Sequence, residues 1–295
     1  MTSKFFPHHP YLRGVLFMVA STASFSLMNV FIRMGAEDIP VTMQVFLRNF
    51  LTVLVLLPLA FRNDFALLRT QRMKSHFWRA TVGVIGMQVW FYCVSILPLN
   101  QATALSFTAP IFTTLVAVVL LKEKADLWRW LGIGASFIGV MIILQPGGGF
   151  TWQSLLVLLA TSMWALAGVL VKSLTSTETP LRIVFFMSMF MALWSLPPAL
   201  YFWRWPAPEA WVILLAMATT AFFAQWLLAK AYKETEVVKL VPFDFGRLIF
   251  TALFAYIAFG ETSHLHTWIG AAIILGCALI AIRRDAKSSA APVSG

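Results

Sequence analysis

The chain has 295 residues, of which 60% are hydrophobic and only 12% are charged, and its mean hydropathy is +0.81. A soluble domain of this length does not carry so many apolar residues, so soluble enzymes and soluble binding modules are excluded. The formal net charge of +10 is compatible with a nucleic-acid-binding protein, but the positions of the basic residues point to membrane topology instead.

Ten apolar stretches are long enough, or nearly so, to cross a bilayer as helices of about 20 residues. They cover residues 12–34, 41–61, 77–96, 102–121, 128–144, 151–171, 181–203, 209–231, 237–259 and 266–282. No segment remains for a soluble domain. The sequence therefore predicts an all-α integral membrane protein with ten transmembrane helices and no soluble catalytic part.

The 22 Lys and Arg residues are distributed very unevenly across the predicted membrane. When the N-terminus is placed in the cytoplasm, only Arg33 and Arg204 fall outside and only Arg48 and Arg247 lie deep within spans, while the other 18 lie in cytoplasmic segments or at the cytoplasmic ends of spans. Cytoplasmic loops of membrane proteins carry such an excess of basic residues. Both termini are therefore predicted to be cytoplasmic, and no nucleic-acid partner is expected.

Two segments near the ends of the two chain halves match each other at identical spacing. They are Leu121-Lys122-Glu123 with Trp130 and Gly132, and Phe259-Gly260-Glu261 with Trp268 and Gly270. Residues 20–33 also align with 159–172. Because each half holds five spans, an odd number, the second half must lie upside down relative to the first. Such inverted repeats bind their substrate between the halves, near the membrane midplane.

The predicted boundaries follow from this duplication. The first repeat covers residues 12–144 and the second covers 151–283, separated by a Pro/Gly-rich run at 145–149, and residues 284–295 form a disordered cytoplasmic tail. Apart from Arg129 at the start of the fifth span, the fifth and tenth spans lack charge, and they are rich in Gly and Ala, which let helices approach closely in lipid. We expect these two spans at the periphery, as packing helices or as a homodimer interface.

The chain resembles the EamA type of the drug/metabolite transporter superfamily. The motifs that carry the resemblance are Ala109-Pro110, Leu121-Lys122-Glu123, Trp130-Leu131-Gly132, Gly260-Glu261, Trp268-Ile269-Gly270 and Phe46-Leu47-Arg48-Asn49. The resemblance covers residues 12–283 and implies a transporter with ten helices. It does not specify the substrate, because members move amino acids, nucleotide derivatives, vitamins, metallophores and drugs.

The second repeat departs from the first at one position of this pattern. Leu248 stands where the first repeat has Pro110, and Pro242 lies upstream, beside Asp244 and Arg247. These two charged residues are three apart and hence lie on one helix face. A charge inside a span is costly and normally faces the interior or a wet cavity. Arg247 therefore either binds a substrate carboxylate, with Asp244 holding it or exchanging a proton, or the two form a structural ion pair.

Further polar and aromatic residues inside the spans are candidate binding groups. Arg48 either reaches the outer interface with its long side chain or lines the cavity. Asn29, Gln88 and Gln225 either bind substrate or hydrogen-bond between helices. Trp164, the deepest of the aromatic residues considered, is a candidate for stacking on a flat or apolar part of the substrate.

Glu123 and Glu261 occupy matched positions at span ends. Their position favours a structural role, accepting hydrogen bonds from the backbone or from Lys or Trp, over a gating role. The sequence contains no HExxH motif, no P-loop and no paired intramembrane catalytic residues, so neither an enzyme nor an ATP-driven pump is indicated, and no metal site or cofactor is expected.

Together these features predict an inner-membrane secondary transporter that works by alternating access. An excess of one positive charge in the interior favours a small carboxylate-bearing substrate, such as an amino acid or an opine-like metallophore. The direction, export, is implied by the resemblance to the EamA type alone, and protons are a candidate coupling ion. Uptake of a vitamin or nucleotide-like compound, dominated by stacking on Trp164 or Trp90, is the alternative. A non-transporting membrane enzyme or accessory protein is the alternative from a different class.

Overall fold

The computed structural model describes residues 10–62, 68–109, 111–112, 115, 127–144, 151–234, 240, 243–244 and 246–290. Within these ranges the regular secondary structure is entirely helical. The helices are α1 (Pro10–Gly35), α2 (Val41–Arg62), α3 (Met73–Ile96), α4 (Leu99–Ser106), α6 (Leu127–Leu144), α7 (Trp152–Thr175), α8 (Pro180–Tyr201), α9 (Pro208–Glu234), α11 (Gly246–Phe259) and α12 (Leu265–Ala290). The predicted all-helical class is confirmed.

Six of the helices in the described part of the chain are long and apolar enough to cross a membrane, namely α1, α2, α3, α7, α8 and α9. They coincide with six of the predicted spans. The apolar parts of α11 and α12 are shorter, at Gly246–Phe259 and Leu265–Cys277. The total of ten membrane crossings and the side of the membrane on which the termini lie remain predictions.

The fourth predicted span is not the continuous helix 102–121 that its apolar sequence indicates. Helix α4 begins earlier, at Leu99 after Pro98, and ends at Ser106, where Phe107 and Thr108 form a turn. The residue four positions after Ser106 is a proline, which has no N–H to donate to the Ser106 carbonyl. In the turn, the backbone hydrogen bond spans three residues instead of four: the N–H of Phe107 donates to the carbonyl of Ala104 at 3.2 Å.

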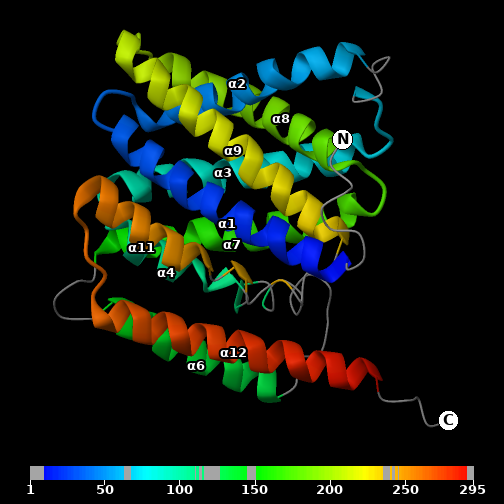
Figure 1. The fold of residues 1–295 in the computed structure, drawn as a ribbon, viewed down its shortest axis with the longest axis vertical. Helices are drawn as coiled ribbons and strands as arrows, with labels where there is room; N and C mark the ends of the chain where they lie inside the picture. The colour runs from blue at the N-terminus through cyan, green and yellow to red at the C-terminus, as the bar shows by residue number, and fades with distance from the viewer. Residues whose placement is uncertain are drawn as a thin grey trace.

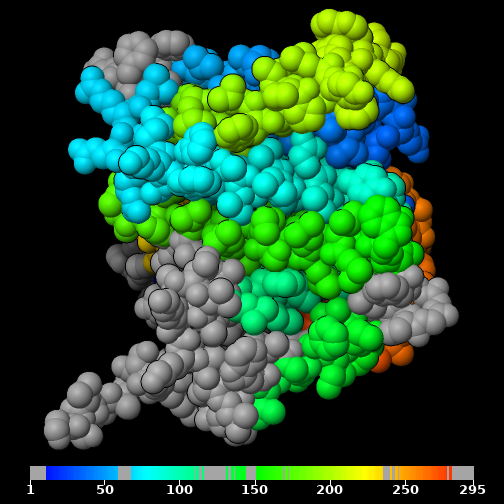
Figure 2. Space-filling view, turned by 180° about the vertical axis from the view of Figure 1, so that it is seen from behind, coloured from blue at the N-terminus to red at the C-terminus, as the bar shows by residue number. Residues whose placement is uncertain are grey.

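The helices pair in a pattern that exchanges the two halves of the chain (Figure 1). Helix α1 packs on α9 and α11, while α7, its counterpart in the second half, packs on α3 and α4. The equivalent helices α2 and α8 pack on each other, as do α6 and α12. Figure 2 shows the opposite face, where α3 and α7 run side by side across the middle. This is the set of contacts that a pseudo-two-fold axis between two repeats produces.

Helices α6 and α12 form a separate layer at one end of the molecule (Figure 1). Their glycines allow a very close approach, because a Cβ atom on Gly139 would lie 2.8 Å from the Gly270 carbonyl oxygen, and one on Gly270 would lie 2.5 Å from the Gly139 carbonyl oxygen. Two of the small residues expected at the periphery are thus used within the chain. Gly134 and Gly276 have nothing within 4 Å of such an atom, and the homodimer remains a prediction.

The close contact predicts that Gly270→Ala destabilises the protein. The added methyl group must push two backbones apart, which costs about 1–3 kcal/mol. Gly276→Ala, on the same helix, is the matched control, because it meets open space and gains helix propensity of about 1 kcal/mol. Thermal unfolding in detergent should give a lower Tm for Gly270→Ala than for wild type and no loss for Gly276→Ala. Equal melting temperatures for the two variants would contradict this packing.

Candidate substrate-binding site

A chain of buried hydroxyl groups joins α1, α4 and α11 at the centre of the bundle. The Ser26 hydroxyl donates to the Arg247 carbonyl at 3.0 Å, and the Thr251 hydroxyl donates to Ser26 Oγ at 3.0 Å. Thr103 of α4 contacts Thr251 at 3.5 Å. We call Ser26, Thr103, Arg247 and Thr251 the central seam. It lies between helices of the two predicted repeats, where an inverted-repeat transporter binds its substrate.

Arg247 and Asp244 form the ion pair that their spacing favours. The distance from Arg247 Nη2 to Asp244 Oδ2 is 2.7 Å, and the guanidinium carbon lies 5.7 Å from the ring centre of Phe25 and 5.8 Å from that of Phe107. The face of an aromatic ring attracts a cation. The Nε atom of Arg247 is buried and has no hydrogen-bond partner. A substrate carboxylate would therefore have to compete with Asp244 for the guanidinium.

Asn29 and Trp164 are connected through Trp90, a residue that the sequence did not favour as a site residue. The indole N–H of Trp90 donates to Asn29 Oδ1 at 3.1 Å. The ring centres of Trp90 and Trp164 lie 4.8 Å apart, and the two ring planes make an angle of 51°. Three helices, α1, α3 and α7, thus meet at this aromatic pair. A buried Trp needs a partner for its N–H, and this need was the signal that Trp90 belongs with the polar residues.

Phe25 and Trp164 hold matched positions in the two halves. When residues 20–33 are aligned with 159–172, Phe25 corresponds to Trp164. Phe25 extends from α1 toward Arg247 of α11, and Trp164 extends from α7 toward Trp90 of α3. Each half therefore contributes one aromatic side chain from its first helix to the interior.

Arg48 is enclosed by protein. The residue is only 1% exposed. Its Nη1 atom donates a hydrogen bond to Asn49 Oδ1 at 2.6 Å and lies 3.9 Å from the Met87 sulfur. The alternative in which Arg48 reaches the outer interface is therefore wrong, because the side chain does not come to the surface. Within the described residues, no carboxylate forms an ion pair with it.

Gln88 and Gln225 lie apart from the aromatic pair. Gly86 lies on the face of α3 that contacts Trp164. Gln88 comes two residues later and is rotated by about 200° around the helix, so it points away from Trp164. Its Nε2 atom is buried without a hydrogen-bond partner. Gln225 is half-buried on α9, next to the Ala224 carbonyl that accepts a bond from Ser21 at 2.7 Å. A binding role for either glutamine remains a prediction.

Glu261 has the structural role expected of it. It forms an ion pair with Arg33 of α1, and its Oε2 accepts a hydrogen bond from the backbone N–H of Leu99 at 3.0 Å. The carboxylate therefore connects α1, α4 and the end of α11, and the expectation that it accepts backbone hydrogen bonds is confirmed. Glu123, its counterpart, lies outside the described residues.

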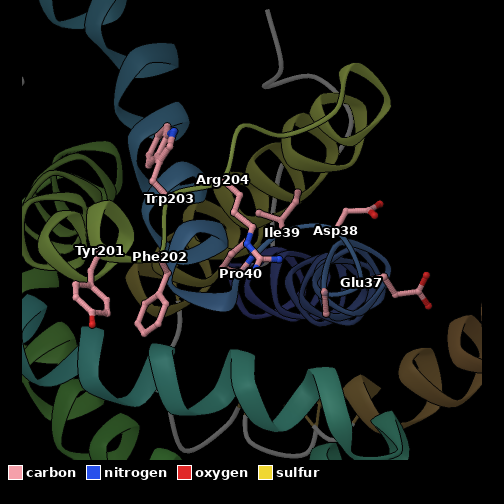
Figure 3. A pocket seen from close by; sticks show the side chains of 9 residues that line it. Glu37, Asp38, Ile39, Pro40, Tyr201, Phe202, Trp203 and Arg204 are labelled. Atoms are coloured by element: carbon pink, nitrogen blue, oxygen red, sulfur yellow. The ribbon is translucent and has the colours of Figure 1, made fainter.

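A surface pocket of about 440 Å³ lies where the connection between α1 and α2 meets the end of α8. Its lining residues are Ala36, Glu37, Asp38, Ile39, Pro40, Tyr201, Phe202, Trp203 and Arg204. In Figure 3 the carboxylates of Glu37 and Asp38 point away from the Arg204 guanidinium. The pocket contains none of the predicted site residues. Among the described residues, no cluster of His, Cys, Asp and Glu could hold a metal ion.

The Trp90–Asn29 hydrogen bond predicts a measurable cost for Trp90→Phe. The substitution leaves the buried Asn29 oxygen without its donor, which costs about 1–3 kcal/mol. Trp152→Phe on α7 is the control, because Trp152 is exposed and such changes stay within about 0.5 kcal/mol. The measurement is chemical unfolding in detergent. A Trp90→Phe variant as stable as Trp152→Phe would show that this hydrogen bond contributes nothing.

Comparison with known proteins identifies the kind of protein that carries this site. The model of the EamA-like transporter family matches residues 12–145 and again 151–283. The chain is 32% identical to a riboflavin transporter of Vibrio cholerae (91% of this chain, 92% of that one) and 33% identical to one of Brucella anthropi (92% and 99%). It is 28% identical to an S-adenosylmethionine uptake transporter of Rickettsia prowazekii (94% and 95%).

These matches cover nearly the whole chain, and the relatives are named as transporters. The protein is therefore a multi-pass membrane transporter of a small molecule and not an enzyme, in agreement with the expectation from sequence. The chain belongs to the EamA-like transporter family.

Proposed function

We propose that the protein is an uptake permease for a flat heteroaromatic metabolite of the vitamin or nucleotide type. The observation that carries the proposal is the contact between Trp90 and Trp164, fixed by Asn29 at the meeting point of α1, α3 and α7. The compounds named for the relatives, riboflavin and S-adenosylmethionine, both contain a fused heteroaromatic ring. The S-adenosylmethionine relative is named as an uptake transporter, which supports uptake as the direction.

Stacking provides the main recognition energy in this proposal. A base on an aromatic side chain contributes about 1–3 kcal/mol, and the half-buried Trp164 offers its ring to the interior. Asn29 uses its oxygen for Trp90, so its amide N–H groups remain to bond a ring carbonyl or ring nitrogen of the substrate. Arg247 is already neutralised by Asp244, so binding needs no carboxylate at that position.

A second candidate is export of a carboxylate-bearing metabolite such as an amino acid derivative or an opine-like metallophore. Arg48 supports it, because this buried cation has no carboxylate partner among the described residues. In either case we infer ten spans in two inverted repeats, 12–144 and 151–283, cytoplasmic termini, and the cell inner membrane as location. The disordered tail expected from residue 284 does not begin there, because α12 continues to Ala290. The binding groups are Trp164, Asn29 and Arg247 with Asp244, and secondarily Arg48, Gln88 and Gln225.

Uptake of labelled riboflavin by cells that produce the protein tests the proposal. Trp164→Ala should lower the initial uptake rate at low substrate concentration about tenfold or more, because one stacking interaction is lost. Trp152→Ala, on the outer face of the same helix, should retain wild-type uptake at equal protein level.

Equal rates for these two variants would contradict a role of the aromatic pair. Wild-type protein that takes up no riboflavin but releases a labelled carboxylate metabolite from preloaded proteoliposomes would favour the second candidate.

Proton coupling through Asp244 is a further part of the proposal. Asp244 is partly exposed beside Arg247 and is therefore placed to exchange a proton during transport. Asp244→Asn should transport at a rate that no longer responds to an imposed pH gradient, whereas wild-type transport should accelerate. Gradient dependence that persists unchanged in Asp244→Asn would rule out this carboxylate as the coupling group.

A further inference from the structure

Three buried cationic or titratable side chains gather between α2 and α3, away from the central seam. His76 and Arg79 lie three residues apart on α3 and are 0% and 5% exposed, and Arg48 of α2 is 1% exposed. Arg48 and Arg79 are close enough to repel each other electrostatically. We call these three residues the Arg79 cluster.

The nitrogen atoms of the Arg79 cluster lack partners to an unusual degree. Buried atoms without a hydrogen bond include Nε of Arg48, Nε and Nη1 of Arg79, and both ring nitrogens of His76. The His76 ring packs on Phe186 of α8 at 4.9 Å instead. A buried donor left unpaired costs about 1–3 kcal/mol and more when it is charged, so this arrangement is costly without a ligand.

Glu178, the acid beside His76 in the described residues, is already engaged. Glu178, in the connection between α7 and α8, accepts hydrogen bonds from Thr70 at 2.5 Å and from Arg182 at 2.6 Å. Burial alone would raise the pKa of the Glu178 carboxyl, but these bonds and the nearby positive charges hold its pKa below the ordinary value. The distance from its Oε1 to His76 Nε2 is 3.9 Å. This carboxylate is therefore paired with Arg182, and within the described residues no ion pair joins it to Arg79 or Arg48.

Membrane topology explains only part of this charge. The positive-inside rule accounts for exposed basic residues at helix ends, such as Arg69. It gives no reason to enclose two guanidinium groups in protein, where an unpaired charge is strongly unfavourable. An anion between them would remove that cost, because guanidinium groups bind carboxylate and phosphate oxygens through charge-assisted hydrogen bonds.

We infer that Arg79, with Arg48 and His76 beside it, forms an oxyanion-binding site that takes a phosphate-type group. Arg79 lies three turns of α3 from Trp90, so this end of the site is separate from the aromatic pair, whereas Arg48 lies nearer to that pair, with Nη1 3.9 Å from the Met87 sulfur. The phosphate group has two sources, a soluble phosphate compound or the headgroup of an anionic phospholipid. Both present the same oxygens to the guanidinium groups.

Purified full-length protein in phosphate-free detergent buffer at constant ionic strength provides the test. Inorganic phosphate is titrated against a chloride control while the Tm is recorded, and native mass spectrometry detects phospholipid that stays bound. The variants are Arg79→Gln and Arg48→Gln, and the control is Arg69→Gln, which removes an equal charge from the exposed surface at the same end of α3.

Wild type and Arg69→Gln should show a phosphate-dependent rise in Tm, and each cluster variant should raise the Kd for phosphate about tenfold or more. If the ligand is a lipid, wild type should instead retain an anionic phospholipid that both cluster variants lose. Without ligand, the Gln variants should melt no lower than wild type, because they remove an unpaired buried charge.

An equal phosphate response in wild type and both cluster variants would overturn the inference. A wild-type protein that responds to no phosphate and retains no phospholipid would overturn it as well. If Arg79→Gln does not fold, Arg79→Lys keeps the charge but loses the planar donor geometry. That variant should bind phosphate more weakly, and wild-type affinity in it would also contradict the site.

Discussion

Ser26 connects α1 to α11 through two hydrogen bonds, one to the Arg247 carbonyl and one from Thr251. In a bilayer, polar groups have no water to bond, so helices that carry them must meet. The hydroxyl contacts thus fix how the first helix of one half lies on a helix of the other half. Phe25 and Asn29, on the same side of α1, are thereby directed toward Arg247 and Trp90.

The charges of the interior fall into two groups with different physical status. Arg247 is paired with Asp244 and covered by aromatic rings, so it can remain in the membrane at little net cost. Arg48 and Arg79 are buried without carboxylate partners in the described part of the chain. The paired Arg247 and Asp244 can line a transport path without adding net charge to it. The unpaired Arg48 and Arg79 can instead bind an anion that stays in place.

Hydropathy was sufficient to predict the helical class and most helix positions, because a long apolar run in lipid has few alternatives. The spacing of Asp244 and Arg247 was likewise sufficient for their ion pair. The break after Ser106 was missed, since the apolar run there continues past the proline. Trp90 was named only in the alternative function and Arg79 was not singled out, because their neighbours lie on distant helices and one sequence does not reveal which helices meet.

Alternating access between two repeats requires the helices that meet at the central seam, α1 and α11 among them, to move apart during transport. Ser26→Cys and Thr251→Cys, in a chain with Cys93→Ser and Cys277→Ser, place two thiols where hydroxyls lie 3.0 Å apart. The measurement is riboflavin flux in vesicles before oxidation, after oxidation and after reduction. The account predicts that cross-linking abolishes the flux and that reduction restores it. Full flux through a completely cross-linked protein would contradict it.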